Sequence, residues 1–185
     1  MKLDKFWAQY AGKPFELIGG EPVARVQKGY LHEMVTSRVL MYLSLYVETH
    51  NLGEVFGDGT HFALAEGELR AADVAFVSAE SLAQIKDPEL YLPFPPDLMI
   101  EVVSPRFTST QIQQKLEVFL DAGTQAAWIV DPEPKQITII FPDGQVDTFE
   151  TGHTIAADGI IPGLNVLADD LFPPLGTPLD HLKLS

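Results

Sequence analysis

The longest regular hydrophobic pattern in the chain runs from Leu31 to about Asn51. Apolar side chains recur there at intervals of three and four residues, which is typical of a helix with one apolar face. These positions are Val35, Val39, Tyr42, Leu43, Tyr46 and Val47. A second helix is predicted from Ser109 or Thr110 to Ala122, because a glycine, a common helix stop, follows it.

Short apolar runs between and after these helices are typical of strands. PDLMIEVVSP at 96–105 and AAWIVDP at 126–132 are almost continuously apolar, which predicts strands buried on both faces. VFGDGTHFAL and LRAADVAFVS, joined by the polar turn AEGE, predict paired strands. KQITIIFPDGQVDTFE predicts a hairpin about its PDG turn.

The order of these elements predicts a mixed central sheet flanked by helices, of α/β or α+β class, with extra β-hairpins. A length of 185 residues suits one domain with a sizeable core. Within this domain, 1–185, we expect an N-terminal arm or hairpin at 1–28 and a core at 31–140. A C-terminal hairpin and extended tail are expected at 141–185.

Composition and charge narrow the class of protein. Apolar residues make up 46% of the chain, but no apolar run approaches the roughly 18 residues of a membrane span, so we expect no membrane segment. The first residues lack the apolar segment of a secretory signal, and cysteine is absent, which together favour a cytoplasmic protein. The formal net charge of −14 argues against broad electrostatic attraction to nucleic acid.

Two acids interrupt apolar strands and are the first candidates for chemistry. Asp73 lies within ADVAFV, and Glu101 lies within LMIEVV. A charge in such a setting costs free energy unless it is paired or bound to a cation. Residue type alone leaves a structural ion pair and a metal site equally open. Paired strands lie about 4.8 Å apart, so these two carboxylates can approach each other if the strands are neighbours.

Asp97 precedes Glu101 by four residues, so both side chains point to the same face of an extended strand. At about 3.3 Å per residue their α-carbons are roughly 13 Å apart, which is a long span for two ligands of one ion. Asp73 is therefore the better partner for Glu101, and Asp97, at the strand entrance, takes a secondary role.

The predicted helix after Glu101 supplies a candidate cation. Lys115 lies three residues after Ile112 and four before Phe119, on the apolar face of that helix. Such a lysine usually flanks an apolar face and extends its ammonium group to water. Because this face should pack against the sheet, Lys115 can approach the two acids. Two strand acids and one helix lysine form a specific combination.

Several other sites are excluded by missing residues. HEMVT at 32–36 resembles the HExxH zinc motif, but Thr36 stands where the second histidine must be. The sequence contains no G-x-x-x-x-G-K segment, so we expect no nucleotide cofactor held by a P-loop. No histidine is placed by sequence as a base for Ser104.

The central block resembles a bacterial family of restriction-endonuclease-like proteins within the PD-(D/E)XK nuclease superfamily. The resemblance rests on PDLMIEVVSP, on Lys115 ten residues after Pro105, and on DAGTQAAWIVDP. It extends to FELIGGEPV, His32, ADVAFV and IIPGLNVLADDLF, and so covers nearly the whole chain. It implies a restriction-endonuclease-like core with a helix, three strands, a second helix and a fourth strand.

The family pattern also implies roles for individual residues. Asp73 would be the motif aspartate, and Glu101 the acid of the E-x-K element. The lysine commonly follows that acid by two residues, where this chain has Val103, and Lys115 matches a replacement on the following helix. Two positions depart from the pattern: alanine replaces the usual proline before Asp73, and Gln111 stands where an acid is frequent.

The resemblance further implies a Mg²⁺ or Mn²⁺ ion bound by Asp73, Glu101 and the backbone carbonyl of Val102, lowering the pKa of a bound water. Lys115 would orient that water or stabilise the transition state. Glu33 would contribute through a further water, whereas the neighbouring histidine is expected to be a structural or capping residue. The expected activity is that of a metal-dependent endonuclease hydrolysing DNA phosphodiester bonds, as a homodimer if both strands are cut.

A catalytically inactive module of the same fold is the alternative hypothesis. It would bind protein or nucleic acid and keep the acids for structure, and the net charge of −14 favours it. Against it, the negative charge could lie away from a local basic path near the site. The candidates for such a path are Arg25, Lys28, Arg38, Arg70 and Arg106.

Overall fold

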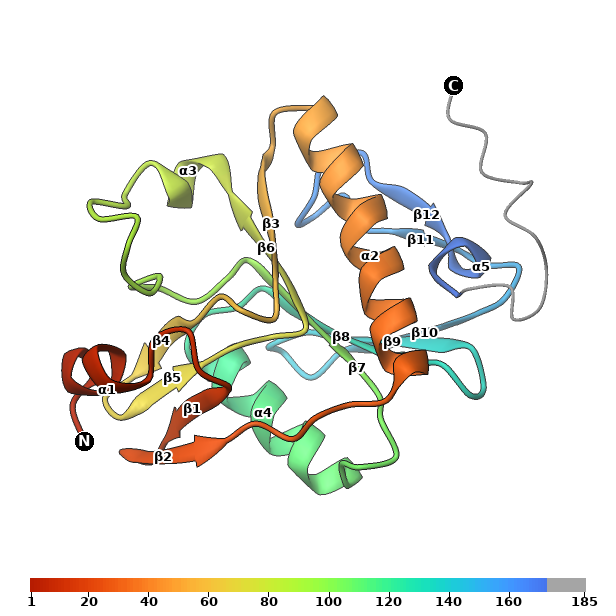
Figure 1. The fold of residues 1–185 in the computed structure, drawn as a ribbon. Coiled ribbons are helices and arrows are strands. Elements are labelled where there is room, and N and C mark those ends of the chain that lie inside the picture. The colour runs from red at the N-terminus through yellow and green to blue at the C-terminus, as the bar shows by residue number, and fades with distance from the viewer. Residues whose placement is uncertain (173–185) are drawn as a thin grey trace.

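A six-stranded mixed sheet forms the centre of the molecule (Figure 1). The computed structural model describes residues 1–172. The strand order is β10-β9-β8-β7-β6-β3, with β7 and β8 parallel and the other neighbours antiparallel. The strands are Gly53–Gly57 (β3), Val74–Ser78 (β6), Leu98–Val102 (β7), Ala126–Asp131 (β8), Gln136–Ile140 (β9) and Val146–Glu150 (β10).

Two long helices pack on this sheet, as the sequence predicts. They are α2 (Tyr30–Thr49) and α4 (Ser109–Asp121). Alternation along β7 directs Leu98 and Ile100 into the cluster that includes α2, and Met99 into the cluster that includes α4. The two helices therefore cover opposite faces of the sheet, and Glu101, two residues after Met99, is on the α4 face.

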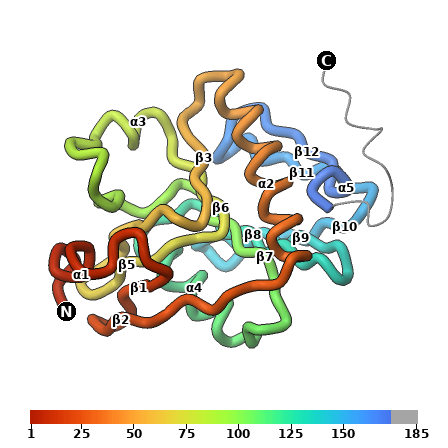
Figure 2. The backbone as a smooth tube through the Cα atoms, in the orientation of Figure 1, coloured from red at the N-terminus to blue at the C-terminus, as the bar shows by residue number. Residues whose placement is uncertain are grey.

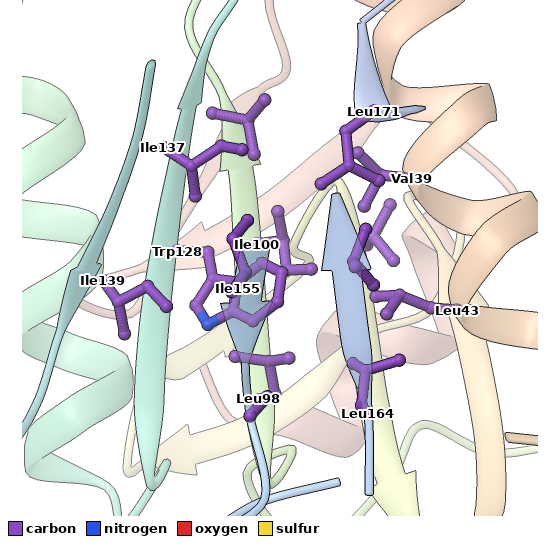
Figure 3. Packing of buried hydrophobic residues seen from close by; sticks show 14 of the residues in the cluster. Val39, Leu43, Leu98, Ile100, Trp128, Ile137, Ile139, Ile155, Leu164 and Leu171 are labelled. Carbon is purple, nitrogen blue, oxygen red and sulfur yellow. The ribbon is translucent and has the colours of Figure 1, made fainter. Parts of the chain in front are cut away.

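The larger apolar cluster lies under α2 (Figure 3). It joins the helix, the sheet and segments close to the C-terminal end of the described chain. The labelled members are Val39, Leu43, Leu98, Ile100, Trp128, Ile137, Ile139, Ile155, Leu164 and Leu171. This face of the sheet is accordingly a closed core, and the chemistry-bearing side chains are left to the α4 face and the sheet end.

Local sequence explains where α4 begins and ends. The Thr108 side chain accepts a hydrogen bond from the backbone N–H of Gln111, and the Gln111 side chain accepts one from the backbone of Thr108, which forms a capping box. The helix ends before Gly123, which has a φ of 115°, a conformation that favours glycine. The start at Ser109 agrees with the prediction.

A smaller four-stranded sheet, with the order β2-β1-β5-β4, lies beside the central one. Its strands are Phe15–Ile18 (β1), Glu21–Ala24 (β2), Phe62–Ala65 (β4) and Glu68–Arg70 (β5). The β1–β2 hairpin lies where we expected an arm or hairpin, but the helix α1 (Leu3–Tyr10) before it was not predicted. In Figure 2 the linker after β2 runs from this small sheet to the start of α2.

The predicted pairing of VFGDGTHFAL with LRAADVAFVS is divided between the two sheets. β3 pairs with β6 in the large sheet, whereas β4 pairs with β5 in the small sheet. The irregular residues between β3 and β4 and between β5 and β6 carry the chain from one sheet to the other. The consequence is that Asp73, in the second of these connections, lies where the sheets meet.

The C-terminal part contains short elements in place of a wholly extended tail. They are β11 (Thr154–Ala156), β12 (Asn165–Leu167) and α5 (Ala168–Leu171). A further short helix, α3 (Ala79–Leu82), precedes the proline-rich loop. The rest of the expected tail, residues 173–185, lies outside the described residues. None of the helices in residues 1–172 has both the length and the apolar character needed to cross a membrane.

Candidate active site

Asp73, the residue immediately before β6, lies beside Glu101 of β7. The register pairs Val74 of β6 with Ile100 of β7, so the next residues outward are Asp73 and Glu101. The backbone N–H of Asp73 donates a hydrogen bond to Glu101 Oε1 at 3.2 Å. Asp73 is fully buried and Glu101 is 7% exposed. The structure thus brings together the two acids that interrupt the apolar strands.

Lys115 reaches this pair from α4. Its Nζ lies 2.6 Å from Glu101 Oε1, and the lysine side chain is 13% exposed. Leu116 and Phe119 on the same helix are buried in the apolar cluster against the sheet, which fixes the orientation of α4. Asp73, Glu101 and Lys115 are therefore assembled in one place, and their catalytic roles remain predictions.

A third acid, Glu16 of β1, completes the surroundings of Lys115. Glu16 Oε1 lies 3.9 Å from Lys115 Nζ and accepts a hydrogen bond of 2.8 Å from the backbone N–H of Ala71. Its Oε2 lies 3.5 Å from Nε of Arg70. Lys115 is therefore held between an acid of the large sheet and an acid of the small sheet.

Glu16 was missed in the sequence. The signal was nevertheless present, because Glu16 interrupts the apolar run FELI as Asp73 and Glu101 interrupt theirs.

Asp73 is held from three directions. Lys28, in the linker between β2 and α2, donates to Asp73 Oδ1. His32 Nε2 donates to Oδ2 at 2.8 Å, and the backbone N–H of Val102 donates to the same oxygen at 2.9 Å. Because a carboxylate only accepts, Nε2 of His32 carries the proton in this contact. These contacts fix the carboxylate in one orientation.

His32 does not cap the helix, which was one of the two roles expected for it. Gly29 precedes the first helical residue, and His32 is buried on the inner face of α2. His32 lies three residues before Val35, so the helical periodicity could have placed it on this face. Its position makes it a direct partner of Asp73.

Burial and nearby charge shift the pKa values of the two strand acids in opposite directions. Burial alone would raise the pKa of Asp73, but the His32 hydrogen bond and the charges of Lys115 and Lys28 outweigh it and hold this pKa well below its usual range. Burial raises the pKa of Glu101, the charge of Asp73 raises it further, and the two lysines offset these effects only in part. As the pH falls, Glu101 is therefore protonated before Asp73.

The charge on Lys115 is stabilised by its neighbours. Burial would lower the pKa of Lys115, but the charges of Glu101, Glu16 and Asp73 outweigh burial and raise it. For the acid Glu16, burial has the opposite effect and would raise the pKa. The charges of Lys115 and Arg70 outweigh burial, so the pKa of Glu16 is lowered. At neutral pH, Lys115 is consequently a fixed positive charge beside Glu101.

The structure places Asp97 and Glu33 differently from the three assembled residues. Asp97 lies at the other end of β7 from Val102, where it accepts hydrogen bonds of 2.7 Å from the backbone N–H of Ser78 and from Gln125 Nε2. Glu33 has a side chain that is 60% exposed and lies 3.4 Å from Nδ1 of His32. Asp97 thus anchors the strand entrance, and Glu33 reaches Asp73 only through His32.

A cavity of about 360 Å³ opens beside Glu101 and Lys115. Residues of β1, β2, β5, β7, the β2–α2 linker and α4 line it, so both sheets and the helix contribute to its walls. Figure 1 shows where these elements lie. Three of the five basic candidates, Arg25, Lys28 and Arg70, also line it. Arg38 instead donates to the backbone carbonyl of Asp170.

The chain matches a known protein family over most of its length. A family model described as "Uma2: Putative restriction endonuclease" matches residues 3–169. The chain belongs to the Uma2 family. The restriction-endonuclease-like resemblance predicted from PDLMIEVVSP and Lys115 is thereby confirmed at the level of the family.

A solved structure shares the fold of this Uma2 protein. It is described as the crystal structure of "a putative nuclease belonging to DUF820" from Anabaena variabilis. The two chains superpose with a TM-score of 0.79 over 93% of this chain and 97% of the other, at 18% sequence identity. The predicted fold class, a mixed sheet flanked by helices in a nuclease-like arrangement, is confirmed. No curated protein matches the sequence.

Restriction endonucleases generally use a divalent metal ion, and Asp73 and Glu101 are the two carboxylates of this Uma2 protein that could bind one. Within residues 1–172, no group of three or more His, Asp or Glu side chains is placed to hold an ion. Mg²⁺, however, is usually bound through one or two carboxylates, with water and substrate phosphates completing its coordination. Asp73 and Glu101 supply two carboxylates, and the ammonium groups of Lys28 and Lys115 already place positive charge on both.

Proposed function

We propose that this Uma2 protein is a metal-dependent endonuclease that hydrolyses phosphodiester bonds in DNA. The observation that carries the proposal is the meeting of Asp73, Glu101 and Lys115 beside a cavity that Glu101 and Lys115 line. Membership of a family described as "Putative restriction endonuclease" supports the same conclusion. Two buried acids beside a charged lysine suit a reaction whose transition state gathers negative charge on phosphate oxygens.

Each residue of the site has a separate role in the proposed reaction. Asp73, Glu101 and the backbone carbonyl of Val102 would hold Mg²⁺ or Mn²⁺, which when bound supplies Lewis acidity and lowers the pKa of a water ligand. Lys115 would donate from its ammonium group to the phosphate oxygen that gains charge. Glu16 would keep Lys115 charged and in place, and His32 would fix the Asp73 carboxylate.

Hydrolysis of the phosphodiester requires one bond to form and one to break. The oxygen of water bonds to phosphorus, the bond from phosphorus to the leaving sugar oxygen breaks, and a proton is transferred to that oxygen. Asp97 would act at a distance, by fixing where β7 begins, and Glu33 would act through His32 or a water. We infer a cytoplasmic site of action, and a homodimer if both strands of a duplex are cut.

One observation favours the inactive module as a second candidate. Lys28 and His32 already contact both oxygens of Asp73, as the partners in a purely structural cluster would. Such a protein would bind a partner without cutting it. The two hypotheses differ in whether a divalent ion can displace Lys28 from the carboxylate.

Calorimetric titration with Mn²⁺ distinguishes the two candidates. We expect wild-type protein to bind Mn²⁺ and Asp73→Asn to lose that binding, because the amide brings no charge to the ion. Wild-type protein should also cut DNA, supplied as plasmid and as single strands, with Mg²⁺ or Mn²⁺. Mn²⁺ binding that is equal in Asp73→Asn, or wild-type protein that cuts no DNA with either metal, would contradict the proposal.

Replacing Lys28 by methionine should tighten Mn²⁺ binding roughly tenfold, which corresponds to about 1.4 kcal/mol. The ammonium group competes with the ion for Asp73 Oδ1, and methionine keeps most of the side-chain volume without the charge. Titration calorimetry gives the dissociation constant directly. Lys86→Met, on the surface, is the matched control and should leave it unchanged. Weaker Mn²⁺ binding by Lys28→Met would mean that Lys28 does not compete with the metal.

A further inference from the structure

The cavity beside Glu101 and Lys115 has apolar side chains on two sides, among the polar and charged ones that also line it. Ile18, Val23 and Val26 line it from the small sheet and the linker, and Phe107, Ile112 and Val118 line it from the side of α4. Val23 and Val26 are 42% and 44% exposed, which is high for valine side chains. Such a surface suits the face of a nucleic-acid base better than a sugar-phosphate backbone.

The cations of this cavity already have carboxylate partners. Arg25 pairs with Asp58 at 3.2 Å, Lys28 with Asp73, Arg70 with Glu68 at 3.3 Å, and Lys115 with Glu101 at 2.6 Å. A duplex carries about one phosphate charge per 1.7 Å of its axis, and proteins that bind it neutralise several of these with Lys and Arg. The chain has a net charge of −14. Among the described residues, the cavity therefore offers no unpaired cation for the several phosphates that a duplex presents at once, whereas one nucleotide brings a single phosphate.

The size and depth of the site also argue against the binding of a duplex. Its volume of about 360 Å³ is near the lower end of the roughly 300–1,000 Å³ of small-molecule pockets. The major groove of a duplex alone is about 12 Å wide, so a stacked duplex cannot enter. Glu101 is 7% exposed, so a phosphate of the nucleic acid must enter the cavity, away from its neighbouring phosphates, to reach it. An unstacked nucleotide can make this movement, whereas a paired one must first be extruded.

Polar groups at the rim can read or hold a base edge. Gln111 uses its Oε1 in the α4 cap, which leaves its amide N–H groups available as donors among the described residues. Gln114 is exposed and also lines the cavity. Phe107 is half-buried, with Lys28 Nζ 5.6 Å from its ring centre. An aromatic ring and neighbouring amides are the usual elements of single-strand recognition.

We propose that this cavity takes one unpaired nucleotide of single-stranded DNA, with the base against Phe107 and the valines and the phosphodiester at Lys115. The inference rests on the proposed nuclease function and specifies its substrate class. It also removes the need for two active sites, since cutting a single strand requires only one. Duplex DNA is then a poor substrate except at frayed or damaged positions.

Binding and cleavage are measured separately, so that the two proposals can fail independently. Fluorescence anisotropy with a labelled oligonucleotide, in Ca²⁺, should show the single strand binding at least about tenfold tighter than the same sequence as a duplex. With Mn²⁺, the single strand should be cut at least about tenfold faster. Equal or better binding and cleavage of the duplex overturns the inference and leaves the nuclease intact. Preferential single-strand binding without any cleavage overturns the nuclease and supports the binding site.

Substitutions of residues that line the cavity test whether a base binds there. Phe107→Ala should weaken single-strand binding roughly five- to hundredfold, the range for loss of one stacked base. Phe141→Ala, a half-buried phenylalanine outside the cavity, is the matched control and should have no effect on binding. Val26→Glu provides a second test at an exposed position, where added negative charge should weaken binding while circular dichroism stays unchanged. Unaltered binding by both wall variants would show that the base does not lie here.

Discussion

Lys115→Met should reduce DNA cleavage by about two to three orders of magnitude, the usual cost of removing one group that stabilises transition-state charge. The ammonium group lies 2.6 Å from Glu101 and carries a charge that burial alone would disfavour, so a neutral side chain cannot replace it. The rate is measured as metal-dependent nicking of DNA under single-turnover conditions.

Controls separate this loss of activity from a loss of structure. Lys86→Met removes an exposed lysine and should retain the wild-type rate. Removing Lys115 leaves Glu16 and Glu101 without their shared cation, so the variant must be checked by its unfolding transition. Lys115→Arg keeps the charge and tests whether charge alone suffices. If folded Lys115→Met nicks DNA at the wild-type rate, the proposed catalytic role of Lys115 is wrong.

Asp73→Ala should lower the free energy of unfolding by about 3–5 kcal/mol, the usual cost of removing one partner from a buried ion pair. Lys28 and His32 would then be buried without the carboxylate that both contact, and the N–H of Val102 would lose its acceptor. Urea unfolding at neutral pH measures the change. Asp58→Ala breaks the pair with Arg25, in which Asp58 is 59% exposed, and should cost at most about 1 kcal/mol.

The lowered pKa of Asp73 also predicts how the free energy of unfolding depends on pH. The pKa of Asp73 is lowered in the folded protein, whereas an unfolded aspartate titrates near 3.9, so the ionised carboxylate stabilises the fold above about pH 4. This contribution is lost as the pH falls below that value towards the folded pKa. The stability difference between wild type and Asp73→Ala should therefore shrink as the pH falls below about 4. A difference that grows in acid would contradict the assigned direction.

The sequence predicted the central assembly because two simple patterns apply there. An acid within an apolar strand must find a partner, and this identified Asp73 and Glu101. A lysine on the apolar face of a helix that packs on the sheet can approach such acids, and this identified Lys115. The alternation of side chains along β7 then places Glu101 on the α4 face, as the observed contact requires.

The other partners depend on contacts that local patterns do not specify. Lys28 lies in a linker without periodicity, and only the arrangement of two sheets brings it to Asp73. Glu16 and His32 had usable signals, one as an acid in an apolar strand and one on the inner face of a helix. Even so, neither signal indicates which acid or lysine will be the partner, since β1 reaches the site through pairing with the distant β5.

The chain's two tryptophans give each sheet its own optical signal. Trp128 is fully buried in β8, whereas Trp7 of α1 lies against His61 and Tyr91 beside the small sheet. Single-tryptophan variants would therefore show whether both regions melt together or the small sheet detaches first. Lys115 contacts acids from both sheets, so early detachment of the small sheet would disrupt the site before the large sheet unfolds. The fluorescence of Trp7 would then report the loss of activity on heating.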